Sequence, residues 1–203
     1  MKGLLYKDFC MLRRSLWSML ILVAVFCLVP EDTFFNLGLF FVIYTGLLPA
    51  SLLSFDERSK WDKLAPMLPV TRREIVRSKY VMGFYLTLAA GALFFLGRAA
   101  GARVAAPKAA AMALSATAVG LLFQSVLYPF LFRLGVEKGR LAMGGVTAVM
   151  VFLCVSGGLF TTRAAAVDQV MTAGSAPVFF ALAVVAELVS IRVAERQYAR
   201  REG

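Results

Sequence analysis

The sequence predicts an all-α integral membrane protein of six transmembrane helices, organised as a single domain over residues 1–203. Sixty per cent of the 203 residues are hydrophobic, whereas soluble domains carry about 45 to 50% apolar residues. A bilayer core of about 30 Å is spanned by roughly 20 helical residues, and the apolar residues gather into runs of nearly that length. The runs cover residues 15–29, 34–53, 80–97, 109–132, 141–160 and 176–191.

The basic residues predict the direction of the crossings, because short loops rich in Lys and Arg stay on the cytoplasmic side. With the N-terminus inside, 18 of the 22 basic residues fall on one side of the membrane. They precede the first run, connect the second to the third, follow the fourth and fill the tail at 192–203. We therefore expect both termini in the cytoplasm, in a bacterial plasma membrane.

The first 14 residues are predicted to form an amphipathic helix that lies in the membrane interface. At 100° per residue one face is apolar and the other is basic. The apolar stripe consists of Leu5, Phe9, Leu12 and Leu16, and Lys7 with Arg14 lies nearly opposite. The alternative is that these residues only begin the first transmembrane helix early.

The longest polar segment, residues 54–79, contains two helix-start signals. Ser54 with Glu57, and Thr71 with Glu74, match the S/T-x-x-E capping box. In this motif the hydroxyl and the carboxylate bind unpaired backbone N–H groups at the start of a helix. We expect a short cytoplasmic helix that ends near the prolines at 66 and 69, and a second helix that continues into the third span.

Trp61 is the only tryptophan of this polar segment. It belongs either to an aromatic belt at the membrane surface or to a docking surface for a cytoplasmic partner. The sequence favours neither interpretation.

Polar side chains within the spans have two interpretations. Thr45, Gln124 and Ser125 either bond neighbouring helices or line a translocation path, and packing is the interpretation we favour. Glu187 is the acidic residue near the inner end of the last span. An intramembrane carboxylate is expensive and suggests function, but here we favour an interfacial carboxylate paired with a basic side chain.

The sequence lacks the residues on which several classes of protein function depend. The chain has no histidine, its three cysteines are unclustered, and no GxxxxGK[ST] phosphate-binding loop occurs. We therefore expect no catalytic residues, no metal site and no cofactor on this chain. The net charge of +10 is dispersed among loops, which favours lipid head groups over nucleic acid as partner. Energy for transport would have to come from an ion gradient or a separate nucleotide hydrolase.

Three segments resemble the small membrane subunits of bacterial type-2 ABC exporters: residues 1–9, 54–64 and 68–80, with weaker similarity at 128–140 and 190–196. The resemblance implies a permease that dimerises and docks a separate ATP-binding subunit, which holds ATP and Mg. It also implies a coupling helix between spans two and three. The residues matching that element are Asp56, Glu57, Arg58, Trp61, Asp62 and Lys63, with Leu68, Pro69, Thr71 and Arg72 as the adjoining turn.

The leading hypothesis is thus the permease subunit of an ATP-driven exporter that works by alternating access. A stand-alone channel or ion-coupled carrier is one alternative, and a non-transporting membrane scaffold or sensor is another. The substrate, and whether the second permease subunit is identical or a paralogue, stay open.

Overall fold

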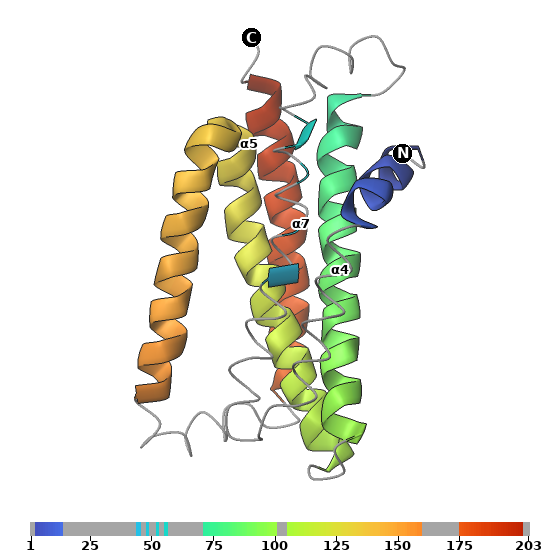
Figure 1. Cartoon of the computed structure of the whole chain (residues 1–203), viewed down its shortest axis with the longest axis vertical. Helices are drawn as coiled ribbons and strands as arrows, with labels where there is room; N and C mark the ends of the chain where they lie inside the picture. The colour runs from blue at the N-terminus through green and yellow to red at the C-terminus, as the bar shows by residue number, and fades with distance from the viewer. Residues whose placement is uncertain are drawn as a thin grey trace.

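The computed structural model describes residues 3–13, 44, 45, 48, 52, 55, 56, 71–100, 105–159 and 175–200. For some of these residues the structure describes the backbone and not the side chain, namely at 72, 98, 100, 134–143, 146, 147, 150–159, 199 and 200. The described chain is helical, with long helices α4 (Arg72–Ala100), α5 (Ala106–Leu159) and α7 (Ala176–Arg200) packed side by side (Figure 1).

Helix α4 starts with the capping box that the sequence predicts at Thr71 and Glu74. The Thr71 backbone N–H donates to Glu74 Oε2 at 2.9 Å, and the Glu74 N–H donates to Thr71 Oγ1 at 3.3 Å. These reciprocal bonds occupy backbone groups that a helix start leaves unpaired. The prediction is confirmed, whereas the box at Ser54 and Glu57 lies outside the described residues.

Helix α5 contains the fourth and fifth predicted spans and the basic connection between them. The backbone remains helical from Ala106 to Leu159. A straight helix of that length would measure about 80 Å, more than twice the bilayer core. Figure 1 shows that α5 is not straight: it bends sharply, and its second arm runs back beside the first. Helical hydrogen bonds therefore satisfy the polar backbone through most of the turn.

Three helical segments are long and apolar enough to cross a membrane: Arg73–Gly97, Ala106–Arg133 and Ala176–Tyr198. They correspond to the third, fourth and sixth predicted spans and extend each of them. The first two predicted spans lie almost entirely outside the described residues. For the fifth, the structure describes the helical backbone as far as Leu159 and the positions 144, 145, 148 and 149 with their exposure. The chain is therefore a membrane protein with several candidate spans, and the count of six stays a prediction.

The core between these helices is built from aromatic and aliphatic side chains. Its largest cluster joins α4, α5 and α7 through Val76, Tyr80, Phe123, Leu127, Tyr128, Leu131, Phe132 and Ala194. Tyr80 packs edge-on against Tyr128, with ring centroids 4.8 Å apart. Such aromatic contacts add about 0.5 to 1.5 kcal/mol beyond area burial. The cluster fixes the relative positions of the three helices near the start of α4.

The N-terminal helix at 3–13 forms as predicted. Leu4, Asp8 and Leu12 form the face buried against the bundle, and Phe9, predicted to be on the apolar stripe, is 51% exposed. Leu12 packs in a cluster with Met82 and Leu86 of α4. Asp8 on the same buried face meets Lys79 of α4. The predicted position of the helix in a membrane interface stays a prediction.

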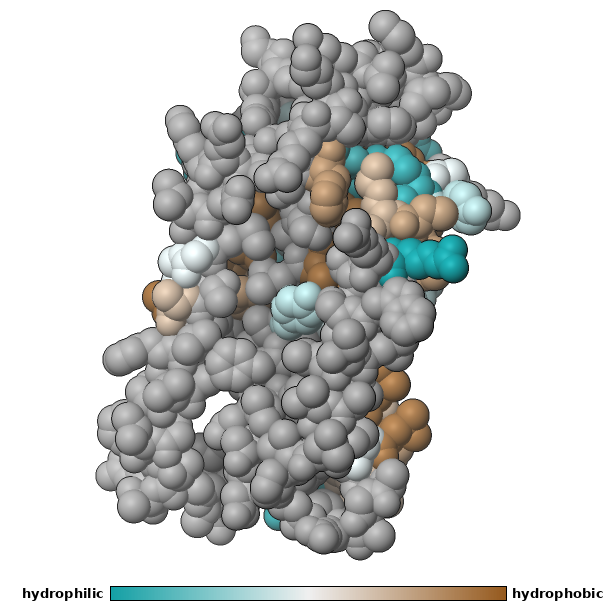
Figure 2. Space-filling view, viewed as in Figure 1, coloured by the Kyte–Doolittle hydropathy of each residue, from teal (hydrophilic) through white to brown (hydrophobic). Residues whose placement is uncertain are grey.

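Most of the described cations lie at one end of the bundle. The N-terminal helix, the start of α4, the bend of α5 and the C-terminal end of α7 share that end in Figure 1. Figure 2 shows hydrophilic side chains gathered over the N-terminal helix and apolar ones farther along the α4 edge. The cations that were predicted to share one side of the membrane therefore share one end of the helical bundle. We refer to the end formed by the N-terminal helix, the start of α4, the bend of α5 and the C-terminal end of α7 as the charged end.

Candidate functional site

A cluster of two lysines and two aspartates lies at the charged end. Lys79 Nζ of α4 is 2.7 Å from Asp8 Oδ1 of the N-terminal helix and 2.7 Å from Asp56 Oδ2. Lys7 Nζ is 2.7 Å from Asp56 Oδ1 and 3.7 Å from Asp8 Oδ1. We call these residues, Lys7, Asp8, Asp56 and Lys79, the four-charge cluster. Opposite charges alternate around it, so each carboxylate faces both ammonium groups.

The four-charge cluster is almost completely removed from solvent. The side chains of Asp8, Lys79 and Asp56 are 0%, 2% and 7% exposed, and that of Lys7 is 20% exposed. Burial of isolated charges is prohibitive, but the cluster is neutral as a whole and its pairs are at hydrogen-bond distance. It therefore joins three segments that are far apart in the sequence: the N-terminal helix, the segment at Asp56 and α4.

A hydrogen-bonded chain crosses the bundle beside the four-charge cluster, through Tyr80, which follows Lys79 on α4. Ser190 Oγ donates to the Ser125 carbonyl at 2.5 Å, and Tyr80 Oη lies 2.7 Å from the same hydroxyl. Because the Ser190 hydrogen is committed to Ser125, Tyr80 is the donor to Ser190. The chain connects α4, α7 and α5 and satisfies three polar groups within an apolar core.

Glu187 lies on α7, one turn from Ser190, and is 3% exposed. Among the described residues neither of its carboxylate oxygens has a hydrogen-bond partner. The predicted pairing with a basic side chain is therefore wrong for the described part of the chain. The Arg77–Glu195 pair, 2.6 Å apart, connects α4 to α7 at the charged end. Glu187 precedes Glu195 by two helical turns and so lies about 12 Å deeper along the helix.

A cavity of about 230 Å³ opens beside Glu187 between α4 and α7. Its walls are aromatic and aliphatic: Tyr80, Val81, Phe84 and Tyr85 from α4, and Val184, Leu188 and Ile191 from α7. The Tyr80 hydroxyl is already bound to Ser190. Glu187 is therefore the acidic group of a mostly apolar cavity.

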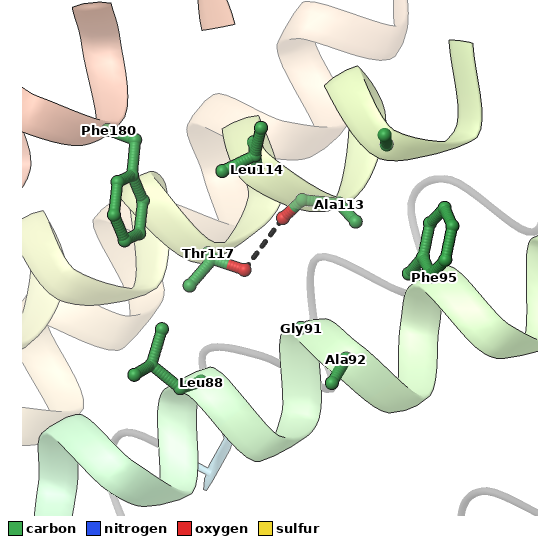
Figure 3. A pocket seen from close by; sticks show the side chains of 9 residues that line it. Leu88, Gly91, Ala92, Phe95, Ala113, Leu114, Thr117 and Phe180 are labelled. Atoms are coloured by element: carbon green, nitrogen blue, oxygen red, sulfur yellow. Dashed lines mark hydrogen bonds between the residues drawn. The ribbon is translucent and has the colours of Figure 1, made fainter. Parts of the chain in front are cut away.

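A second cavity, of about 300 Å³, lies toward the opposite end of the bundle. Figure 3 shows its walls: Leu88, Gly91, Ala92 and Phe95 of α4 face Ala113, Leu114 and Thr117 of α5, with Phe180 of α7 behind. The Thr117 hydroxyl donates to the Ala113 carbonyl at 2.6 Å, drawn as a dashed line. Since this hydroxyl is bound within its own helix, the lining offers a ligand little beyond apolar contact.

Two glycines of α4 allow α4 and α5 to approach each other closely. A Cβ on Gly83 would overlap the Gln124 side chain and the Tyr128 hydroxyl, and a Cβ on Gly91 would overlap Thr117. Small residues at helix interfaces have this effect in membrane proteins. Neither glycine was predicted as a contact, and no pattern in the sequence distinguishes them from the other glycines.

A family model described as "ABC-2 family transporter protein" matches residues 3–198. The chain belongs to this family. The match covers nearly the whole chain and confirms the resemblance identified from the sequence. No curated protein and no solved structure matches the chain.

Family membership makes this protein an ABC-2 transporter membrane component with transmembrane helices. Such components are typically non-catalytic and generally work with a separate ATP-binding subunit. Among the residues that the structure describes, no group of three or more acidic, cysteine or histidine side chains is placed to hold a metal ion.

The coupling residues predicted for this ABC-2 protein are only partly described. Asp56 is in the four-charge cluster, with both carboxylate oxygens directed at lysines. Thr71 is exposed at the start of α4, and the backbone of Arg72 forms its first turn. The others lie outside the described residues: Glu57, Arg58, Trp61, Asp62, Lys63, Leu68 and Pro69. Sequence reasoning missed the partners of Asp56, namely Lys7, Asp8 and Lys79.

The four residues predicted as possible path residues do not form one site. Gln124 is buried between α4 and α5, where its Oε1 accepts a bond from Thr87 Oγ1 at 3.3 Å. Ser125 donates to the Leu122 carbonyl of its own helix, and Thr45 is buried. Of the four, only Glu187 lines one of the two cavities described above. The bond of Gln124 joins two helices, whereas that of the Ser125 hydroxyl stays within α5.

Proposed function

We propose that this chain is the permease subunit of an ATP-driven exporter, which moves a substrate out of the cytoplasm or the inner leaflet. Membership of the ABC-2 family supports the class of machine. The observation that carries the proposal is the four-charge cluster, because it joins the predicted coupling segment directly to α4. In an exporter of this kind, ATP binding and hydrolysis occur on the partner subunit, and this chain must receive the resulting movement.

In this proposal Asp56 is a positioning residue. Its carboxylate connects Lys7 of the N-terminal helix with Lys79 of α4, so a displacement of the coupling segment is transmitted to both helices. The docking contacts themselves are then the neighbouring predicted residues, with Trp61 as the central anchor. ATP can drive the change only if the ATP-binding subunit has different affinities for the two permease conformations.

The proposal includes an orientation and an assembly. The charged end faces the cytoplasm, in accordance with the positive-inside rule, and the ATP-binding subunit docks there. Two permease subunits, identical or paralogous, form the complete pathway in the bacterial plasma membrane, and they alternate between inward-open and outward-open arrangements.

The test is reconstitution of the purified chain with its ATP-binding subunit in proteoliposomes. We expect Trp61→Ala and Glu57→Lys to weaken capture of the ATP-binding subunit, since interface anchors cost about 2 kcal/mol or more, roughly 30-fold. Asp56→Asn should retain capture but lose the change in ATP hydrolysis that the permease imposes on its partner. Glu195→Lys, at the same end and outside the docking segment, is the matched control for capture.

Two results would refute the proposal. One is capture of the ATP-binding subunit that both docking variants leave unchanged. The other is transport by the purified chain alone under an ion gradient, which the stand-alone carrier predicts.

A further inference from the structure

The unpartnered carboxylate of Glu187 identifies a second site, distinct from the four-charge cluster. The side chain is 3% exposed, and neither oxygen has a hydrogen-bond partner among the described residues. A carboxylate inside a membrane protein costs a few kcal/mol on insertion scales unless something offsets it. Packing needs no acid at this position, since Val184, Leu188 and Ile191 supply the apolar contacts of the same helix.

The surroundings of Glu187 define the chemistry of a ligand. Three aromatic residues of α4, Tyr80, Phe84 and Tyr85, line the cavity with it. The negative faces of aromatic rings attract cations, most strongly where water is excluded. Among the described residues no basic side chain lines the cavity, so an anion would meet repulsion from the carboxylate.

A bare metal ion is a poor fit to the same lining. Ca²⁺ takes six to eight oxygen ligands and Mg²⁺ requires octahedral coordination. Here one carboxylate stands among aliphatic and aromatic walls, and the hydroxyl of Tyr80, one of the two tyrosines in that lining, is bound to Ser190. An organic ammonium group on an apolar body matches both parts of the cavity.

We propose that the cavity between α4 and α7 binds an amphipathic organic cation, with its ammonium group at Glu187 and its apolar part against Phe84 and Tyr85. This inference rests on the proposed exporter function and adds the substrate class. Tyr85 and Leu188 line the cavity and are 65% and 57% exposed. The mouth therefore opens on the lateral surface of the helices, where a membrane-dissolved amphiphile would enter.

The test uses a matched pair of probes, 2-(1-naphthyl)ethylamine and 2-(1-naphthyl)ethanol. They share the aromatic body and differ in the cationic group, and binding is followed by naphthyl fluorescence at pH 7. The permease is held in phosphatidylcholine nanodiscs without the ATP-binding subunit. We expect the wild type to bind the amine more tightly than the alcohol, by about 30-fold for a desolvated charge pair.

Glu187→Gln should abolish the preference for the amine and leave alcohol binding unchanged, which shows that the cavity is still folded. Glu195→Gln is the matched control, because it removes a carboxylate from the same helix outside the cavity. It should retain the full preference. Equal binding of the two probes to the wild type, or an undiminished preference in Glu187→Gln, would overturn the inference.

The binding assay tests the substrate class and the reconstitution assay tests the exporter function, so each proposal can be refuted without the other. If ATP-dependent coupling is observed but the amine preference is absent, the substrate class is wrong and the exporter function stands. If the preference is present but the ATP-binding subunit is not captured, the cavity stands and the exporter function is wrong.

Discussion

The charged end and the α4–α7 cavity both bury ionisable side chains, but they do so in opposite ways. In the four-charge cluster each lysine has an aspartate at 2.7 Å. In the cavity, Glu187 has no hydrogen-bond partner among the described residues. A neutral, paired cluster can position segments at tolerable cost, whereas an unpaired acid weakens the fold it belongs to. The difference separates a structural use of charge from a ligand-binding one.

The largest expected effect comes from breaking the four-charge cluster with Lys79→Met. Removing one partner of a buried pair costs about 3 to 5 kcal/mol, because Asp8 and Asp56 then share a single ammonium. Thermal unfolding in detergent should show a large loss of stability. Adding Asp8→Asn to the variant restores neutrality and should recover part of it.

Arg77→Met is the matched control for Lys79→Met on the same helix. The Arg77–Glu195 pair is at the surface, with the arginine side chain 52% exposed, and exposed pairs contribute at most about 1 kcal/mol. Equal losses for the two variants would remove the distinction between buried and surface pairs at this end.

The same replacement in the cavity should have the opposite sign. Glu187→Met removes an unsatisfied buried acid and retains similar volume, so we expect a gain of about 1 to 3 kcal/mol. The measurement is again thermal unfolding, in the absence of any cationic ligand. A loss of stability comparable to that of Lys79→Met would mean that Glu187 is paired in the folded protein. The distinction between a paired and an unpaired buried charge would then be wrong.

A last pair of variants tests the α4–α5 contact, with an expected effect similar in size to that of Glu187→Met. Gly83→Ala or Gly91→Ala places a methyl group against Gln124 or Thr117, and overpacking costs about 1 to 3 kcal/mol. Gly144→Ala is the control, since a Cβ there meets nothing within 4 Å. It should be neutral or stabilise α5 slightly through helix propensity. A neutral Gly83→Ala would mean that the two helices separate without cost.

Much of the described fold was predictable from local patterns. The capping box at Thr71 and Glu74 depends only on residues within one helical turn, and both of its predicted hydrogen bonds are present. The three long apolar segments form span-length helices where hydropathy placed them. The bend of α5 was not predictable in this way, because a polar connection between two spans is equally compatible with a loop and with continued helix.

The candidate site was less predictable. Gln124 bonds Thr87 of the neighbouring helix, and the Ser125 hydroxyl bonds a carbonyl of its own helix. Asp56 was selected by resemblance as a docking residue, but its lysine partners are 49 and 23 residues away in the sequence. No periodicity connects such positions. The pairing expected for Glu187 with a basic side chain does not form among the described residues.

The sequence by itself determined that the chain is a membrane protein, where its apolar helices lie and how α4 begins, because these depend on composition and neighbouring residues. Only the tertiary structure decided which face of the N-terminal helix packs on the bundle, which charges pair and which acid has no hydrogen-bond partner among the described residues. Those outcomes depend on distances between segments remote in sequence, which a local pattern of hydrophobicity does not contain.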